Sequence, residues 1–251
     1  MANEDICIEF DDVVAGYKDF MILNNLSFKV RRGSITLLLG PNGAGKSTVL
    51  KTLFGLLKPR QGRILLDGED IAGATQKQLL AKGIAFVPQG RNLFGQLTVF
   101  QNLELGGITL GTKTTHERIP EVLNFFPRVK ERLHSQASAL SGGEQKQLEI
   151  GRALLLRPKV LLIDEPSIGL SPLVVQDVFK LLKNLAAQGT TVLMVEQNVK
   201  SALKISDDAI ALESGQLVLH KPAPELLADP HIERLFLGGG LVPEASATAA
   251  V

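Results

Sequence analysis

Residues 40–48, with the sequence GPNGAGKST, combine residue types and a spacing that suit phosphate binding. Gly43 and Gly45 allow the backbone to bend so that successive N–H groups point at phosphate oxygens, and a helix that starts after them adds the positive end of its dipole. Lys46 would supply a cation for the β and γ phosphates of ATP, and the Ser47 hydroxyl is a candidate ligand of Mg²⁺. The Lys-Ser-Thr sequence disfavours the alternative, a glycine-rich turn without a ligand. The predicted nucleotide-binding residues are Gly40, Pro41, Asn42, Gly43, Ala44, Gly45, Lys46, Ser47 and Thr48.

Two adjacent carboxylates follow a second apolar run. The segment VLLIDEP places Asp164 and Glu165 after four apolar residues, which predicts a buried strand that ends at the acidic pair and disfavours a surface acidic pair. Ligands of open α/β sheets bind at the carboxyl ends of strands. We expect Asp164 to hold the hydration shell of Mg²⁺ and Glu165 to be the general base that polarises the attacking water.

A third apolar run, Thr191 to Val195 in TVLMVEQNV, delivers two polar side chains, Glu196 and Gln197, at its carboxyl end. The amide of Gln197 can donate a hydrogen bond to a phosphate or a water, but it cannot take up a proton as a histidine can. Two alternatives stay open at this point: Gln197 caps the helix predicted for NVKSALKI, or it faces solvent.

The segment LSGGEQKQLEIGRALL, residues 140–155, places small residues at the start of an amphipathic helix. Such a helix start predicts a second anion site, and an ordinary N-cap is the alternative. The phosphate loop lies much earlier in the chain on a different helix, so this second site could only act on ATP that another subunit brings to it. The predicted residues are Ser141, Gly142, Gly143 and Glu144.

The elements that must position these residues alternate between strand and helix, which predicts an α/β fold. ICIEFDDVV and LNNLSFKV have the alternation of half-buried strands, SITLLLG is a buried strand before the phosphate loop, and GRILLDGEDI is a hairpin that turns at Asp67-Gly68. KVLLIDEP and SPLVVQDVFKLLKNLAAQG add a buried strand and a helix that ends at Gly189.

Strand signals vanish between about Phe100 and Ala139, where HERIPEVLNFFPRVKERL predicts a helix with one apolar face. That face consists of Ile119, Val122, Phe126 and Val129. We therefore expect one domain over residues 1–237, with a nucleotide-binding core at about 1–95 and 155–237 and a helical insert at about 96–154. Residues 238–251, rich in Gly, Ala and Ser, are expected to be a mobile tail.

Amino-acid composition and net charge limit the classes of function that fit this chain. The chain has 251 residues, 45% of them hydrophobic and 21% charged, with a net charge of +1 that gives no support to nucleic-acid binding. Cys7 is alone and the start MANED lacks the regions of a signal peptide, so we expect a reducing cytoplasm. No apolar run reaches the roughly 18 residues of a membrane span. The histidines His116, His134, His220 and His231 lack ligand spacing.

Taken together, GPNGAGKST, VLLIDEP and LSGGEQ make residues 6–237 resemble the ATP-binding subunits of ABC transporters. The resemblance implies a phosphate-loop ATPase core with an N-terminal antiparallel β subdomain and an inserted α-helical subdomain. It also implies that two subunits pack head to tail, so that LSGGE of each closes on ATP held by the other.

The same resemblance assigns further residues. Gln89 in VPQG would contact Mg²⁺ and follow the membrane partner, and Tyr17 would stack on adenine rather than pack in a core. Gln197 takes the place of the histidine that contacts the γ phosphate in most of the superfamily. SIGLSP would cross the dimer interface, with Ser171 where many relatives carry an aspartate.

Within that family, VPQGRNLFGQLTV, DEPSIGLSP and VEQN are similar to the LivF-type subunit of branched-chain and neutral amino-acid importers. This resemblance implies a second, non-identical ATPase, two transmembrane permease subunits and, indirectly, an extracytoplasmic binding protein. The subunit would then lie on the cytoplasmic face of the inner membrane. A urea or amide importer, a soluble ABC ATPase and an exporter ATPase are the alternatives, and nucleic acid is not an expected partner.

Overall fold

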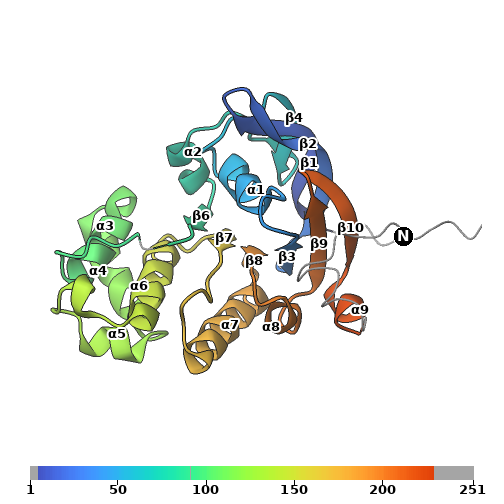
Figure 1. Ribbon diagram of the computed structural model, residues 1–251. Helices are drawn as coiled ribbons and strands as arrows, with labels where there is room; N and C mark the ends of the chain where they lie inside the picture. The colour runs from blue at the N-terminus through green and yellow to red at the C-terminus, as the bar shows by residue number, and fades with distance from the viewer. Residues whose placement is uncertain (1–4, 91, 229–251) are drawn as a thin grey trace, which may run out of the picture.

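The computed structural model describes residues 5–90 and 92–228, and the tail predicted for residues 238–251 lies outside them. Two sheets and the helices around them make up this part of the chain (Figure 1). Over the described residues, no helix has the length and apolarity needed to cross a bilayer.

Within the described residues, an antiparallel sheet in the order β2-β1-β4-β5 is built from the N-terminal segments. Its strands are β1 (Ile6–Tyr17), β2 (Phe20–Arg31), β4 (Gln61–Leu66) and β5 (Glu69–Asp70). The predicted turn at Asp67-Gly68 joins β4 to β5, and both residues have positive φ angles, 53° and 80°. Asp-Gly suits that turn because both positions need the left-handed region.

The second sheet has the order β10-β9-β3-β8-β7-β6 over the same residues. Its strands are β3 (Ile35–Leu39), β6 (Ile84–Val87), β7 (Val160–Asp164), β8 (Thr191–Val195), β9 (Asp208–Glu213) and β10 (Gln216–Pro222). All neighbours are parallel except the edge pair β9 and β10. The carboxyl ends of β3, β8 and β7 therefore lie side by side, although the three strands are far apart in the sequence.

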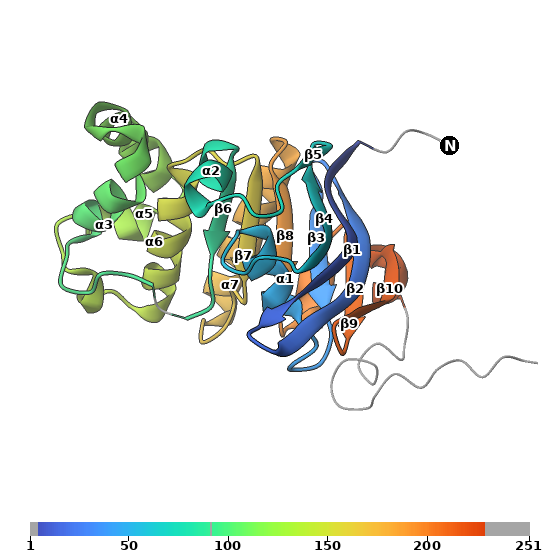
Figure 2. The same ribbon diagram turned by 90° about the horizontal axis from the view of Figure 1, so that it is seen from above.

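Helices cover both faces of this second sheet. They are α1 (Lys46–Leu53), α2 (Gln76–Ala81), α7 (Pro172–Ala187), α8 (Val199–Leu203) and α9 (Ala223–Leu227). Helix α1 lies between the two sheets, and α7 and α8 lie on the opposite face of the six-stranded sheet (Figures 1 and 2). Buried side chains form one hydrophobic cluster on each side of that sheet, because its central strands are apolar on both faces.

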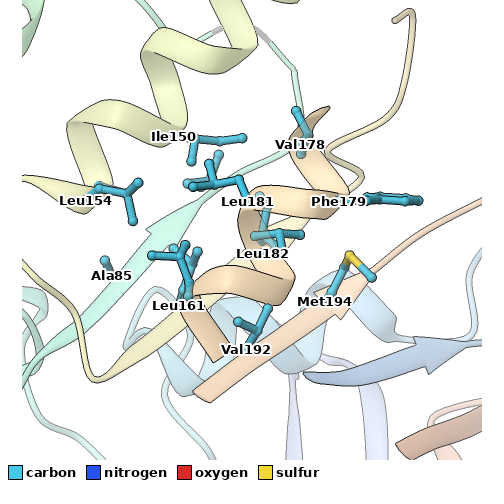
Figure 3. Packing of buried hydrophobic residues seen from close by; sticks show 14 of the residues in the cluster. Ala85, Ile150, Leu154, Leu161, Val178, Phe179, Leu181, Leu182, Val192 and Met194 are labelled. Atoms are coloured by element: carbon cyan, nitrogen blue, oxygen red, sulfur yellow. The ribbon is translucent and has the colours of Figure 1, made fainter. Parts of the chain in front are cut away.

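Figure 3 shows the packing on the face of the six-stranded sheet that α7 covers. Val192 and Met194 of β8 and Leu161 of β7 lie against α7, whose Leu182 is fully buried. Burial of a leucine of this kind contributes about 1.5–3 kcal/mol. The apolar layer between the sheet and α7 thus stabilises the strands that end at the predicted site.

The remaining helices form a separate group beside the six-stranded sheet (Figure 1). They are α3 (Val99–Gly106), α4 (Thr112–Leu123), α5 (Pro127–Glu131) and α6 (Gly142–Leu154), with short 3₁₀ turns at Ile108–Leu110 and Ala137–Ala139. The four residues of the predicted apolar face are all buried, but the single helix predicted for them is wrong. The chain leaves helical geometry at Phe126 and restarts with Pro127 at the first position of α5, because proline lacks the N–H that a continuous helix requires.

Candidate functional site

The phosphate loop joins β3 to α1 at the carboxyl end of the sheet. Gly45, the residue directly before α1, has a φ of 103°, a left-handed conformation that favours glycine. No side chain caps the first turn of α1. Gly40 is required for a different reason: a Cβ there would lie 2.2 Å from the carbonyl oxygen of Leu212. The sequence thus shapes a loop whose helix N-terminus stays open toward a ligand.

Lys46 is buried at the base of this loop. Its Nζ donates to the carbonyl oxygens of Gly40 at 2.8 Å and Pro41 at 2.9 Å. Burial lowers the pKa of the ammonium, and the nearby carboxylates of Glu165 and Asp164 oppose that effect. The Lys46 ammonium therefore already has carbonyl acceptors, and the phosphate oxygens of a triphosphate could replace these acceptors or add to them.

Asp164 ends β7 and is almost completely buried. Burial raises the pKa of its carboxyl group, while a hydrogen bond with Ser47 acts in the opposite direction. Its Oδ1 atom is buried without a hydrogen-bond partner. A buried carboxylate oxygen without a partner, beside a hydroxyl, is a donor set that suits a hard cation such as Mg²⁺.

Glu165 follows Asp164 and lies between two side-chain amides. Gln89 Nε2 donates to its Oε2 at 2.6 Å, and Gln197 Nε2 donates to its Oε1 at 2.8 Å. The φ of Glu165 is 49°, a sparsely populated conformation for a residue with a side chain. Three separate segments thus meet at this one carboxylate.

Gln197 lies just beyond β8, as its place in TVLMVEQNV predicts. Asn198, and not Gln197, caps the following helix: its Oδ1 accepts from the N–H of Ser201 at 3.2 Å. Of the alternatives left open by the sequence, capping by Gln197 is therefore wrong. The side chain is exposed, yet its amide is directed to Glu165.

These groups line a cavity of about 410 Å³ at the strand ends. Tyr17, at the end of β1, forms one wall; it is 43% exposed, which rules out core packing, and its hydroxyl accepts from Lys51 Nζ at 3.4 Å. The cavity is lined by Tyr17, Ile22, Asn42, Gly43, Gly45, Lys46, Ser47, Thr48, Gln89, Glu165 and Gln197. Asp164 adjoins it through its bond with Ser47.

The segment from Ser141 to Glu144 does not line that cavity. Ser141 is the N-cap of α6, and it forms a reciprocal capping box with Glu144. The Glu144 carboxylate accepts from both the N–H and the hydroxyl of Ser141, at 2.8 and 2.9 Å, and the Ser141 oxygen accepts from the Glu144 N–H. The N-cap that the sequence offered as the alternative is thus present, and the predicted anion site at this helix start stays a prediction.

The sequence motifs assign no function to Glu196. It is one of the most buried charged residues of the described chain and makes several hydrogen bonds at the end of β8. Its position at the carboxyl end of a buried strand was the signal that could have drawn attention to it.

Comparison with known proteins identifies the family. A family model described as "ABC transporter" matches residues 23–168, more than half of the chain. The chain belongs to the ABC transporter family. The matched segment holds the phosphate loop, the segment from Ser141 to Glu144 and the pair Asp164–Glu165, whereas Tyr17 and Gln197 lie outside it.

Two curated relatives match this ABC ATPase over nearly its full length. The high-affinity branched-chain amino acid transport ATP-binding protein BraG of Pseudomonas aeruginosa is 43% identical, covering 92% of this chain and all of that protein. The probable branched-chain amino acid transport ATP-binding protein LivF of Archaeoglobus fulgidus is 39% identical, covering 89% of this chain and 95% of that protein. The predicted similarity to LivF-type subunits is confirmed.

A solved dimeric ATP-binding cassette bound to ADP and phosphate has the same fold. It matches with a TM-score of 0.76 and 27% identity, covering 86% of this chain and 98% of that chain. The predicted fold class is confirmed, and the protein is an ABC ATPase that binds ATP. ABC cassettes form dimers and work with membrane permease subunits.

Proposed function

We propose that this chain hydrolyses ATP to power uptake of branched-chain or other neutral amino acids through a membrane ABC importer. The observation that carries the proposal is the meeting of Lys46, Glu165 and Gln197 around one cavity, in a chain 43% identical to BraG. It works on the cytoplasmic face of the inner membrane with two permease subunits, a second and non-identical ATPase, and an extracytoplasmic binding protein upstream. We further propose that residues 1–237 form one ATPase domain with a helical subdomain at about 96–154.

In this proposal, the phosphate loop and Lys46 bind the triphosphate, and Tyr17 stacks on the adenine. Ser47, Asp164 and Gln89 would hold Mg²⁺, which would supply positive charge to neutralise the triphosphate. The described residues contain no group of three or more His, Cys, Asp or Glu that could hold a metal ion alone. Such a sparse set suits Mg²⁺, which completes its coordination with waters and substrate phosphates.

Glu165 is the proposed general base. Both of its carboxylate oxygens accept from amides, an arrangement that fixes the direction of the side chain. A carboxylate held in this way can accept a proton from the attacking water while Gln197 orients the water or the γ phosphate. Since an amide does not gain a positive charge, Gln197 offers position and no charge switch.

The partner ATPase completes the site in the proposed head-to-tail dimer. The residues that line the cavity leave one side of it to solvent, and Ser141 to Glu144 of this chain lie elsewhere. In the dimer, the corresponding segment of the partner closes on ATP bound here, and Ser141 to Glu144 of this chain close on ATP bound to the partner. Two exposed apolar side chains lie at the loop proposed to cross that interface: Ile168 is within it and Leu173 follows it directly.

The test is purification of the chain with a tag from its native membranes, followed by reconstitution of what is retained. We expect two polytopic proteins and a second ATPase, and ATP hydrolysis that rises with branched-chain amino acids and their binding protein. Stimulation by urea or amides instead would overturn the amino-acid assignment. Recovery of the chain without membrane proteins would overturn the importer assignment in favour of a soluble ABC ATPase.

The matched variant for this test is Glu165→Gln, which keeps the size of the side chain and removes the base. Hydrolysis should fall by about 10²-fold or more while ATP binding is retained, because general-base catalysis contributes about 10²–10⁴-fold. Transport should stop with the complex still assembled. Normal turnover at this site, measured with the partner's site inactivated, would show that Glu165 has another role.

A further inference from the structure

Glu196 is a buried carboxylate that the proposed chemistry does not use. It follows Val195 at the end of β8, is 2% exposed and does not line the nucleotide cavity. Burial of a carboxylate is unfavourable unless hydrogen-bond donors surround it. The donors around Glu196 therefore show what this side chain holds together.

Those donors come from two segments of the chain. Oε1 accepts from the N–H of Ser167 at 2.7 Å, and Oε2 accepts from the Ser167 hydroxyl at 2.7 Å. Oε2 also accepts from the N–H groups of Gln197 at 2.9 Å and Asn198 at 3.3 Å. One carboxylate thus ties the loop after β7 to the segment after β8.

Each tied segment carries one member of the proposed reaction centre. Ser167 lies two residues after Glu165, and Gln197 is the residue whose amide donates to Glu165 Oε1 at 2.8 Å. The N–H of Glu165 also donates to the carbonyl oxygen of Val195 at 2.9 Å. The contacts form a closed ring through Glu165, Ser167, Glu196 and Gln197, and a ring of this kind restricts how the base and the amide move relative to each other.

We propose that Glu196 is a positioning residue that fixes Glu165 and Gln197 relative to each other in the arrangement needed for hydrolysis. The proposal rests on the function proposed above, since it assumes that Glu165 is the base. Glu196 does not line the cavity; it acts through the main chain of Gln197 and through Ser167. It also supports the unusual φ of Glu165, a conformation that persists only where its surroundings hold it.

An amide cannot replace this carboxylate. A glutamine at position 196 would turn its NH₂ group either toward the Ser167 N–H or toward the N–H groups of Gln197 and Asn198, so that donors face donors. The Ser167 hydroxyl can rotate to accept a hydrogen bond, but main-chain N–H groups cannot. Glu196→Gln therefore keeps the shape of the side chain and releases at least one of the two segments.

The first experiment measures amide hydrogen exchange in the full-length chain without nucleotide. In Glu196→Gln, exchange should accelerate in residues 165–172 and 196–199 together, because both lose an acceptor, while β3 and β7 keep their protection. Glu225→Gln, which changes an exposed glutamate on α9, should match the wild type. Unchanged exchange in both segments would overturn the proposal.

The second experiment separates binding from turnover. Glu196→Gln should lower single-turnover hydrolysis by about tenfold to a hundredfold, as expected for a shift of a reacting group by about 1 Å, with the dissociation constant for a fluorescent ATP analogue changed by less than about threefold. An equal loss of affinity and turnover would mean general damage to the fold and would overturn the positioning role.

A double variant tests the route through Gln197. Glu196→Gln should lower turnover less in a Gln197→Ala background than in the wild type, because the two residues act on the same carboxylate. Independent, multiplicative effects would contradict the ring. Should Glu196→Gln fail to fold, Ser167→Ala breaks the same link from the other segment and should lower turnover by about threefold to tenfold; unaltered turnover would overturn the proposal.

The outcomes for the two proposals are distinguishable. A wild-type chain that neither binds nor hydrolyses ATP would overturn the proposed function. The exchange experiment needs no nucleotide, so it judges the link between Ser167, Glu196 and Gln197 by itself.

Discussion

Helices α1 and α6 both start in glycine-rich sequences, yet their N-termini differ. Helix α1 follows Gly45 and has no side-chain cap, and Lys46 is the only charged side chain in its first turn. Helix α6 follows Ser141 and is closed by its own capping box, with the Glu144 carboxylate on the Ser141 N–H and hydroxyl. The start of α1 has no side-chain cap, whereas at α6 the capping box pairs the N–H groups of Ser141 and Glu144 within the chain.

This difference is consistent with the two modes of phosphate binding proposed above for the two helix starts. The open N-terminus of α1 leaves N–H groups for a triphosphate bound by the chain itself. At α6, a capping box stabilises the helix by about 1 kcal/mol, and an acidic side chain there already interacts with the helix dipole. In the proposed dimer, a phosphate of the partner's ATP would approach a helix start that already carries the Glu144 carboxylate, so we expect this site to bind phosphate only when a second subunit is docked.

The largest effect is expected at α1. Lys46→Ala removes the cation of the open site, so ATP affinity should fall and hydrolysis at this site should drop by about 10²-fold or more, since preorganised charges of this kind contribute about that much. Nucleotide titration and phosphate release measure both effects. Lys58→Ala, at an exposed position, is the control; wild-type affinity and turnover in Lys46→Ala would contradict the assigned phosphate loop.

The next effect concerns α6 and should appear at the other site. Ser141→Arg destroys the capping box and places a large side chain at the dimer interface, so ATP bound to the partner should be hydrolysed about 10²-fold more slowly, as for loss of a positioned donor. ATP bound to this chain should be affected less. Site-resolved turnover in the complex, with each catalytic glutamate mutated in turn, checks this prediction, and equal losses at both sites would argue against head-to-tail packing.

A smaller effect is expected at Gln197, which faces the open site. Gln197→Ala should slow hydrolysis there by about tenfold, because Glu165 loses one of two positioning amides. Gln197→His should be tolerated or faster, because histidine can donate and can also become charged. Single-turnover assays with the partner site inactivated measure both variants. An untouched rate in Gln197→Ala would show that the amide does not contact the γ phosphate.

The smallest effect is expected from Glu144→Gln. The amide keeps the capping geometry in part but removes a negative charge that would repel a phosphate at this helix start, so ATP-dependent association with the partner should strengthen by about twofold to fivefold. Association is measured by light scattering or sedimentation at fixed Mg-ATP. Glu117→Gln, an exposed change on α4, is the control. Weaker association would mean that Glu144 assists phosphate binding rather than competing with it.

Local patterns in the sequence predicted the elements that end at the site. The run Thr191 to Val195 matches β8 without a shift, since a fully buried strand has a continuous apolar sequence with polar residues at its ends. Two further local signals predict details of the helices. Proline at position 127 separates α4 from α5, and the Ser-x-x-Glu spacing at 141–144 specifies a capping box.

Other features depend on contacts that no local pattern encodes. Gln89 and Gln197 reach Glu165 across 76 and 32 residues of sequence. A buried ion pair within α6, Lys146 with Glu149 at 2.6 Å, ties the segment after Gln89 to the helix through the N–H of Asn92. Charges on a helix usually indicate a solvated face, so only the tertiary structure shows that this pair is inside.

The strand order also governs when the protein becomes complete during synthesis. Strand β3 leads into the phosphate loop and is made early, yet both of its neighbours, β8 and β9, lie beyond residue 190. Until they emerge from the ribosome, β3 has two unpaired apolar edges, the kind of surface that invites aggregation or chaperone binding. A nascent chain that already carries the whole of GPNGAGKST therefore still lacks the site built around it, and ATP can assist folding only in the final stage of translation.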